Sequence, residues 1–235
     1  MSDEIVSAIT KPKGRKSLFH FTRVRNLPAM AHLDALLSSY RINREAASGE
    51  RRPQAVEVQY EAYPITLNAH LKIADIVIDM STTQEQFRAY LNRHVFLWPT
   101  LRDCRKMMET YARREPDESF AVLEMNAYAL LSGHRAAVKL SKYDSGSSPR
   151  FPAACTYKKS PDMFLPLDRF KQVSNHTVPA KVSEIHEVLV EDQVTGITRL
   201  LQTIWIDRRE AAPLCWRDKA RALSELRDLE TGGRD

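Results

Sequence analysis

The apolar residues of this chain form short blocks whose spacing switches between strand-like and helix-like periods, and this pattern most limits the folds open to it. Residues 18–22 alternate apolar and polar side chains as a strand does, whereas Met30, Leu33 and Leu37 follow at helical spacing. The two periods are mixed without regular βα alternation, so they favour an α+β fold over a doubly wound sheet. The longest apolar runs fall far short of the ~20 residues of a membrane span, which excludes a transmembrane protein.

Local signals place further elements along the chain. Asn26 is expected to cap a helix with Pro28 in its first turn, and Thr82 and Glu85 have the spacing of a capping box for a helix over 82–93. Thr100 is expected to cap the helix after it. Strands are expected at 56–60, 94–98, 119–125, 136–140, 182–190 and 201–206. We expect a mobile basic N-terminal segment over 1–16, one domain over 17–210, and a C-terminal helix over 211–235 packed on that domain.

Glycine and cysteine usage exclude several classes of site. The chain has only 7 glycines in 235 residues, and none are spaced as a dinucleotide-binding or P-loop phosphate cradle requires. Its 3 cysteines lie far apart, without a C-x-x-C pair, and neither H-E-x-x-H nor a deaminase pattern is present. We interpret the cysteines as reduced structural thiols, with one catalytic cysteine as the alternative, and expect no metal. Residues 1–17 hold no secretory signal, so the expected compartment is the cytoplasm.

The net charge of +5 is compatible with a polyanionic partner. Basic residues gather near the start of the chain and again at 41–52. The first cluster has two interpretations, a solvated tail or an arm that follows phosphates. Its candidate nucleic-acid-binding residues are Lys13, Arg15, Lys16, Arg23 and Arg25.

Two strands carry polar side chains where apolar ones are expected. His20 and Thr22 share the face opposite Phe19 and Phe21, so they either find structural hydrogen-bond partners there or hold a ligand. Glu187 points the same way as its aliphatic neighbours in the strand over 182–190. A carboxylate in that position is unfavourable unless it is paired or lines a cleft, so a salt bridge, an edge strand and a functional role all remain open.

These residues together suggest a family. His20-Phe21-Thr22 followed by Asn26-Leu27 resembles the H-x-T-x-x-x-N-L opening of DarT-like ADP-ribosyltransferases, which modify nucleic acid using NAD. Phe96-Leu97-Trp98 followed by Arg102-Asp103-Cys104 is similar to that family's aromatic strand and arginine-methionine segment, although the family has phenylalanine-tyrosine-phenylalanine and arginine-serine-proline-methionine there. His186-Glu187-Val188 is similar to the late strand that bears the catalytic glutamate. The matches occur in the same order, over about residues 18–206.

The resemblance implies a split mixed β-sheet with an NAD cleft and peripheral helices, over 17–210. It implies that Glu187 and Arg102 are catalytic, and that Glu187 stabilises the positive charge that develops when the nicotinamide–ribose bond breaks. The family's arginine that contacts the cofactor or the substrate can correspond to Arg51, Arg52 or Arg102. The implied cofactor-binding residues are His20, Thr22, Asn26, Leu27 and Arg52.

The expected function is therefore transfer of ADP-ribose from NAD to a base of DNA or RNA, with release of nicotinamide. The family resemblance implies a toxin-antitoxin or phage-defence effector, with an antitoxin or ADP-ribose-removing protein as a partner. Two alternatives remain: a non-catalytic nucleic-acid-binding module on the same scaffold, and a metal-independent ribonuclease using His20, His134 or His186. A protein acceptor also remains open.

Overall fold

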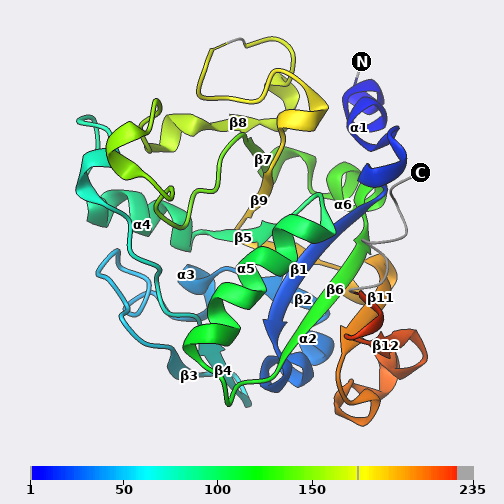
Figure 1. The fold of residues 1–235 in the computed structure, drawn as a ribbon. Helices are drawn as coiled ribbons and strands as arrows, with labels where there is room; N and C mark the ends of the chain where they lie inside the picture. Colours follow the sequence, from blue (N-terminus) through cyan, green and yellow to red (C-terminus); the bar gives the residue numbers. More distant parts are fainter. Residues whose placement is uncertain (1, 174, 227–235) are drawn as a thin grey trace.

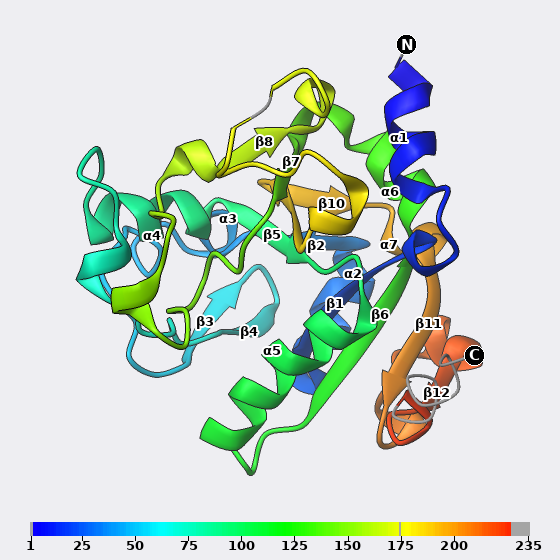
Figure 2. The same ribbon diagram turned by 45° about the horizontal axis from the view of Figure 1, so that its top comes forward.

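The computed structural model describes residues 2–173 and 175–226, and it has the mixed α+β architecture that the sequence predicts. The first of its two larger sheets has the order β1-β6-β11-β12, in which β11 and β12 are parallel and the other pairs antiparallel. Figures 1 and 2 show β1 and β6 side by side, with β12 beside β11. The strands are β1 (Ser17–Arg23), β6 (Phe120–Asn126), β11 (Leu201–Ile206) and β12 (Ala220–Ala222).

The second larger sheet is antiparallel, with the order β5-β9-β7-β8. Its strands are β5 (His94–Leu97), β9 (Glu187–Glu191), β7 (Val138–Ser141) and β8 (Phe164–Pro166). The two sheets meet where β1 passes the end of β5. There, Phe19 and Trp98 exchange two backbone hydrogen bonds, each 2.8 Å long. This bridge brings the early strand β1 close to the sheet that contains the late strand β9.

Helices and two short strand pairs complete the fold. The pairs are β3 (Val56–Tyr60) with β4 (Tyr63–Leu67), and β2 (Ala35–Leu37) with β10 (Gln193–Thr195). Figure 1 shows α5 lying across β1. The helices are α1 (Ser2–Thr10), α2 (Leu27–Leu33), α3 (Ser39–Ile42), α4 (Gln84–Asn92), α5 (Leu101–Arg114), α6 (Ala127–Gly133) and α7 (Ile197–Leu200). No helix of the described residues is long and apolar enough to cross a membrane.

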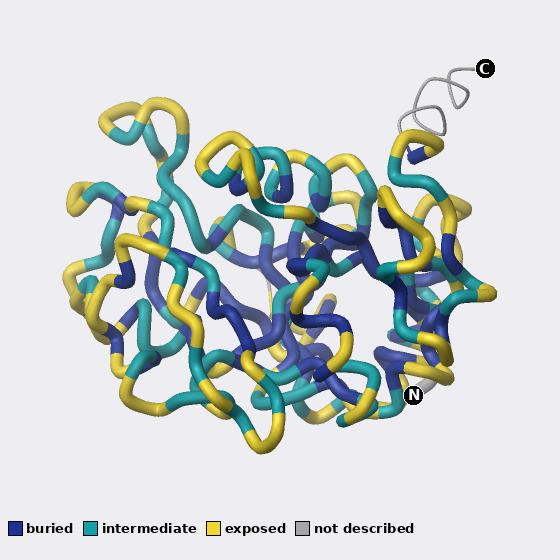
Figure 3. The backbone as a smooth tube through the Cα atoms, turned by 90° about the horizontal axis from the view of Figure 1, so that it is seen from below, coloured by how far each residue is buried: buried dark blue, intermediate teal, exposed yellow. Residues whose placement is uncertain are grey.

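Buried residues gather in the interior of the molecule (Figure 3), and the main apolar core draws on strands of both larger sheets. The largest apolar cluster joins residues of β1, β5, β6, β9 and β11 with residues of α1 and α6. A second, aromatic cluster lies between β1 and α5, where Phe21 packs against Trp98 and Tyr111. Phe19 belongs to the same cluster, which agrees with the predicted alternation of β1.

Several elements differ from the sequence prediction. The expected mobile segment 1–16 contains α1, because Val6 and Ile9 pack into the core beside α6. The helix expected after Pro28 ends at Leu33, and the leucines that follow belong to β2. The capping box of α4 is formed by Thr83 and Gln86, one residue beyond the predicted pair.

The described residues after 210 do not form the long C-terminal helix expected over 211–235. Residues 214–219 form a short 3-10 segment, and Ala220–Ala222 is a strand. Trp216 explains the change, because its ring is fully buried in the main core and its indole N–H donates to Thr198 Oγ1. Leu214, which lies within the range of the expected helix, is 80% exposed. The remainder of that prediction, 227–235, lies outside the described residues.

Candidate active site

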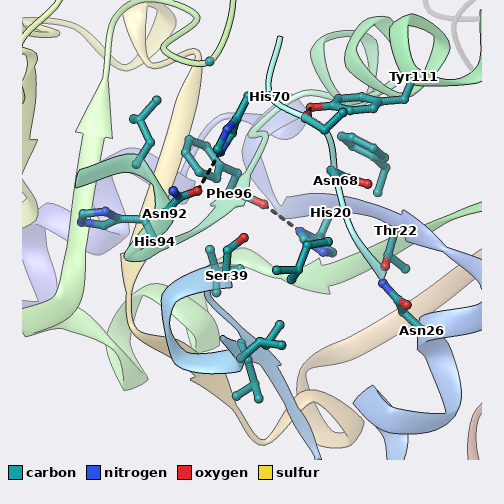
Figure 4. Close-up of a pocket in the computed structure, with 18 of the residues that line it drawn as sticks. His20, Thr22, Asn26, Ser39, Asn68, His70, Asn92, His94, Phe96 and Tyr111 are labelled. Carbon is teal, nitrogen blue, oxygen red and sulfur yellow. Dashed lines mark hydrogen bonds between the residues drawn. The ribbon is translucent and has the colours of Figure 1, made fainter. Parts of the chain in front are cut away.

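A cavity of about 220 Å³ lies between the two larger sheets and the β3–β4 pair. Figure 4 shows polar side chains directed into it from several elements. His20 and Thr22 come from β1, and Asn92 comes from the end of α4. Glu187, the first residue of β9, also lines the cavity. Segments from the beginning, middle and end of the chain therefore contribute to one site.

His20, on β1, is held in one orientation by a backbone carbonyl. The Nδ1–H of His20 donates to the carbonyl of Phe96, at 2.8 Å, because a carbonyl oxygen can only accept. Burial lowers the pKa of His20, so the ring is neutral near pH 7 and its Nε2 is an acceptor. Figure 4 shows His20 and Thr22 along the same strand. His20 and Thr22 both line the cavity, and Phe21 between them lines it as well.

Asn26 lines the cavity without capping the helix that follows it. Its side chain makes no cap hydrogen bond. Instead, its amide donates to the carbonyl of Thr66 and its oxygen accepts the N–H of Thr66, both at 2.9 Å. The predicted cap role is therefore wrong, because the β4 backbone competes for both polar groups of the amide. The Thr66 hydroxyl is a buried polar atom with no hydrogen-bond partner in the described residues, and Thr66 lines the cavity.

Arg52 forms the next part of the wall. Its guanidinium donates to the carbonyls of Ala46 and Asn68 and to Asn92 Oδ1. No carboxylate of the described residues forms an ion pair with it, so its charge is surrounded by neutral acceptors. Burial lowers the pKa of Arg52 to about 10. An arginine retained at a cavity wall without a counterion creates a positive potential in that cavity.

His70 is hydrogen-bonded to Arg52 and Asn92. Its Nδ1 accepts the backbone N–H of Arg52 at 2.9 Å, so its Nε2–H donates to Asn92 Oδ1 at 3.0 Å. Burial, together with the nearby charge of Arg52, lowers the pKa of His70 to about 4. His94 also lines the cavity, and burial lowers its pKa to about 4. Neutral imidazoles and the Arg52 guanidinium therefore share this part of the cavity.

Glu187 lies where β9 begins and is 2% exposed. Its Oε2 accepts two hydrogen bonds from Ser145, the backbone N–H at 3.0 Å and the hydroxyl at 2.6 Å. No hydrogen bond within the described part of the chain reaches its Oε1. Burial, with a contribution from Asp144, raises the pKa of Glu187 to about 8. An edge strand does not explain this carboxylate, because β9 is central in its sheet, and Glu187 forms no ion pair within the described residues.

The other predicted site residues lie outside this cavity. Leu27 is fully buried in the main apolar core. The side chain of Arg102 is 78% exposed, 3.8 Å from Asp103, on the first turn of α5. Arg51 is exposed at the surface beside Arg52. Among the three candidate arginines, only Arg52 lines the cavity.

The N-terminal basic cluster divides into two kinds of residue. The prediction that Arg23 binds nucleic acid is wrong, because its side chain is 1% exposed and paired with Glu115 and Glu118, which leaves no access for a phosphate. Arg15 donates to the carbonyl of Ile185 at 2.7 Å. By contrast, Lys13 and Lys16 are exposed, and Arg25 is about half exposed beside Glu118. A run of basic residues does not reveal which of them are buried in ion pairs.

The alternative catalytic histidines have structural partners. His134 Nε2 accepts the N–H of Thr195 at 3.0 Å, away from the cavity. His186 lies 3.5 Å from Asp103 and outside the cavity lining. The three cysteines are free thiols, and burial raises the pKa of Cys104. The described residues contain no group of three or more His, Cys, Asp or Glu side chains able to hold a metal.

Sequence reasoning missed the residues that support the site. His70, Asn92, Ser145 and Thr66 have no motif to mark them. His70 ends a polar, proline-interrupted stretch, and Asn92 is a buried polar residue at the end of an amphipathic helix. The turn-rich segment around Ser145 indicates only a loop. Each acquires its role through a partner distant in sequence.

A family model places the chain among related proteins. The model of DUF7002, a family of unknown function, matches residues 16–201. The chain belongs to the DUF7002 family. No curated protein sequence matches it. The matched region of this DUF7002 chain contains β1, the cavity and all of β9.

Solved structures of DarT from Thermus sp. 2.9 are similar to the DUF7002 chain at low identity. The complex of that protein with NAD+ is 14% identical, covers 85% of each chain, and has a TM-score of 0.40. Its complex with ADP-ribosylated ssDNA is 11% identical, covers 94% of this chain and 91% of that chain, and has a TM-score of 0.41.

Proposed function

We propose that the protein transfers ADP-ribose from NAD to a nucleic-acid base and releases nicotinamide. One observation carries this proposal: His20, Thr22 and Asn26 of the H-x-T-x-x-x-N-L motif line the same cavity as Glu187. The two motifs are separated by about 160 residues in the sequence. Two parts of one family pattern that converge on a cavity support a shared chemical role more strongly than either part alone.

The residues present suit a dinucleotide with sugar hydroxyls and a pyrophosphate. The Nε2 of His20 can accept from a ribose hydroxyl, and the unpartnered Thr66 hydroxyl offers a further polar contact. Arg52 supplies positive potential without a protein counterion, which favours phosphate. The cavity of about 220 Å³ is smaller than the ~300–1,000 Å³ typical of pockets that enclose a whole ligand. NAD would therefore insert one end and extend beyond it.

Glu187 is the proposed catalytic residue. NAD supplies a cationic nicotinamide leaving group, and breaking its bond to ribose develops positive charge on the sugar. The buried carboxylate of Glu187 stabilises that charge in a low-dielectric site, while Ser145 holds Oε2 and leaves Oε1 available to a hydroxyl. Because burial raises the pKa of Glu187 to about 8, kcat/KM is expected to rise as the pH approaches 8.

We propose that Arg102 contacts the nucleic-acid acceptor and does not contact NAD. It is exposed at the start of α5, and its neighbour Asp103 contacts His186, the residue before Glu187. Leu27 is proposed to act by supporting β1 from the core and not by contacting NAD. The nucleic-acid acceptor is supported by the net charge of +5 and by exposed Lys13 and Lys16. A toxin or defence role, controlled by an antitoxin or an ADP-ribose-removing protein, completes the proposal.

The deciding experiment is incubation of the protein with NAD labelled in its adenosine part and with separate pools of single-stranded DNA, duplex DNA, RNA and protein. The proposal predicts nicotinamide release together with label in a nucleic-acid pool. Label found only in the protein pool would mean that the acceptor is a protein and that the transfer of ADP-ribose from NAD still holds. Binding of polyanion without NAD turnover would instead establish the non-catalytic binding module, and RNA cleavage without NAD would establish the ribonuclease.

A further inference from the structure

Lys159 is a buried lysine close enough to Glu187, the proposed catalytic carboxylate, to interact with its charge. Lys159 is fully buried, and its backbone is anchored to the neighbouring segment, where its N–H donates to Val77 and its carbonyl accepts from Asp79. Its Nζ donates to three backbone carbonyls, those of Asp144 at 2.5 Å, Ser145 at 3.1 Å and Ser147 at 2.5 Å. An ammonium group has three N–H donors, so these carbonyls satisfy all of them.

The lysine charge is not compensated by a direct ion pair. No carboxylate among the described residues lies within 4.0 Å of Nζ. A buried ammonium is unfavourable unless nearby negative charge compensates for its lost hydration. The carboxyl groups that act on it at longer range are those of Asp144 and Glu187. A neutral donor could satisfy the carbonyls of the turn that Lys159 binds. The hydrogen bonds alone therefore do not explain why a positively charged side chain is buried there.

The carbonyls that Lys159 binds belong to the turn that positions Glu187. Ser145 is in the middle of this turn and donates both of its hydrogen bonds to Glu187 Oε2. The carboxylate of Asp144 closes the turn by accepting from the N–H and hydroxyl of Ser147. Asp144 also repels the charge of Glu187, while Lys159 favours it. Lys159 therefore acts on Glu187 both through the turn and through space.

We propose that Lys159 is a positioning residue for Glu187, which holds the Asp144–Ser147 turn so that Ser145 clamps Oε2, and which offsets the negative charge of Asp144 so that Glu187 can ionise. The catalytic consequence rests on the proposed function. Lys159 positions Glu187 in the protein even when no substrate is bound. Asp144, Ser145 and Lys159 are the charged and hydrogen-bonding groups that act on Glu187.

The test is a carboxyl-carbon NMR titration of Glu187 in the protein alone, with its signal assigned by its loss in Glu187→Gln. In Lys159→Met, the pKa of Glu187 is expected to rise by roughly one unit or more, the scale of removing a nearby opposite charge. Lys158→Met is the matched control, because the Lys158 side chain donates to the carbonyl of Ile76 and does not act on Glu187. An unchanged titration in folded Lys159→Met would overturn the proposal.

Ser145→Ala keeps the inference testable if Lys159→Met does not fold. This variant retains the lysine and removes one of the two donors to Oε2, so the Glu187 pKa should rise. A titration in Ser145→Ala that matches the wild-type protein would contradict the clamp. In a transferase assay, Lys159→Met should move the acid limb of kcat/KM to higher pH by the same amount as the NMR titration, whereas a purely structural role lowers activity equally at all pH values. If no NAD turnover occurs, the proposed function fails while the NMR result still decides the inference.

Discussion

Two buried charge networks in this protein are built in opposite ways. The Arg23 network, at the end of β1, pairs one buried guanidinium with Glu115 and Glu118, at 2.7 and 2.5 Å, so its charges compensate each other. In the Glu187 network, the carboxylate and Lys159 form no ion pair and instead bind the polar groups of one turn. The first network is complete without a ligand. The second leaves a carboxylate at a cavity, where a cationic ligand can complete it.

The difference shows why a buried charge is not by itself a functional signal. Ion pairs with both partners in place are structural, and removal of one partner leaves the other without compensation. A buried carboxylate held by neutral donors has a shifted pKa and retains the capacity to respond to a substrate. Arg52 resembles the Glu187 network in this respect, because it lines the cavity and binds only neutral acceptors.

The largest expected effect breaks the Arg23 network. Arg23→Met should lower the free energy of unfolding by about 3–5 kcal/mol, because it leaves two partly buried glutamates without their main cation. Arg25→Met is the matched control, since that side chain is 55% exposed and its pair with Glu118 should contribute at most about 1 kcal/mol. Urea denaturation measures both. Equal effects of the two substitutions would show that the Arg23 network is not a structural unit.

Next in size is the loss of Glu187 from the proposed reaction. Glu187→Gln should reduce nicotinamide release by about 100-fold or more, the scale of losing one preorganised electrostatic stabiliser, while NAD affinity stays close to wild type and the protein stays folded. Glu191→Gln, at the exposed end of the same strand, should retain activity. Turnover near the wild-type rate in Glu187→Gln would remove this carboxylate from the mechanism.

The pH dependence of the free energy of unfolding should distinguish the contribution of the cavity histidines from that of Glu187. His70 and His94 have pKa values near 4 in the folded protein, below the usual 6.5, so the unfolded chain binds more protons and stability falls as pH decreases from about 6.5 to 4. Glu187 has its pKa raised from 4.5 to about 8, so the folded state binds more protons and stability falls as pH increases through that range.

Between pH 6.5 and 8 the Glu187 contribution is thus separate from that of these histidines. Wild type should lose stability relative to Glu187→Gln as the pH rises across this interval, by at most about 1.4 kcal/mol per pH unit. Denaturant titrations of the two proteins at matched pH give the difference directly. Parallel curves would mean that the pKa of Glu187 is not raised in the folded protein.

A smaller effect is expected at the β1 wall. His20→Ala should weaken NAD binding by roughly 2- to 10-fold, as one hydrogen bond is removed, without abolishing the thermal transition. His32→Ala is the control, because His32 is exposed and outside the cavity. Calorimetric titration and thermal melting measure the two quantities. A missing melting transition, with unchanged affinity in the folded fraction, would make His20 a core residue.

The smallest effect concerns the acceptor. Replacing Lys13 and Lys16 with Ala should flatten the salt dependence of transfer to oligonucleotides, by roughly 0.7 to 0.9 log units of slope for each phosphate group that the variant no longer binds. NAD binding should be unchanged, because neither lysine lines the cavity. The double substitution of exposed Lys106 and Lys171 controls for net charge. Equal slopes in both double variants would exclude the N-terminal lysines from binding phosphates.

The sequence by itself determined the elements that local periodicity encodes. The strands at Val56–Tyr60 and Leu201–Ile206 have the predicted bounds, and Thr100 caps α5 as predicted. Alternation along β1 also predicted that Phe19 and Phe21 pack on one face, and both belong to the aromatic cluster beside α5. These features depend on neighbours only a few residues apart, so the pattern of side chains contains the information.

Only the tertiary structure decided which polar residues are satisfied and which are available. Arg23 falls within a basic run of the sequence, but its partners lie 92 and 95 residues away. Glu187 depends on Ser145, 42 residues earlier, and Ser145 depends in turn on Lys159. Burial and charge compensation are sums over all neighbours in space. The order of residues along the chain does not specify burial or charge compensation. Both are decided only when the fold brings the two sheets together at Phe19 and Trp98.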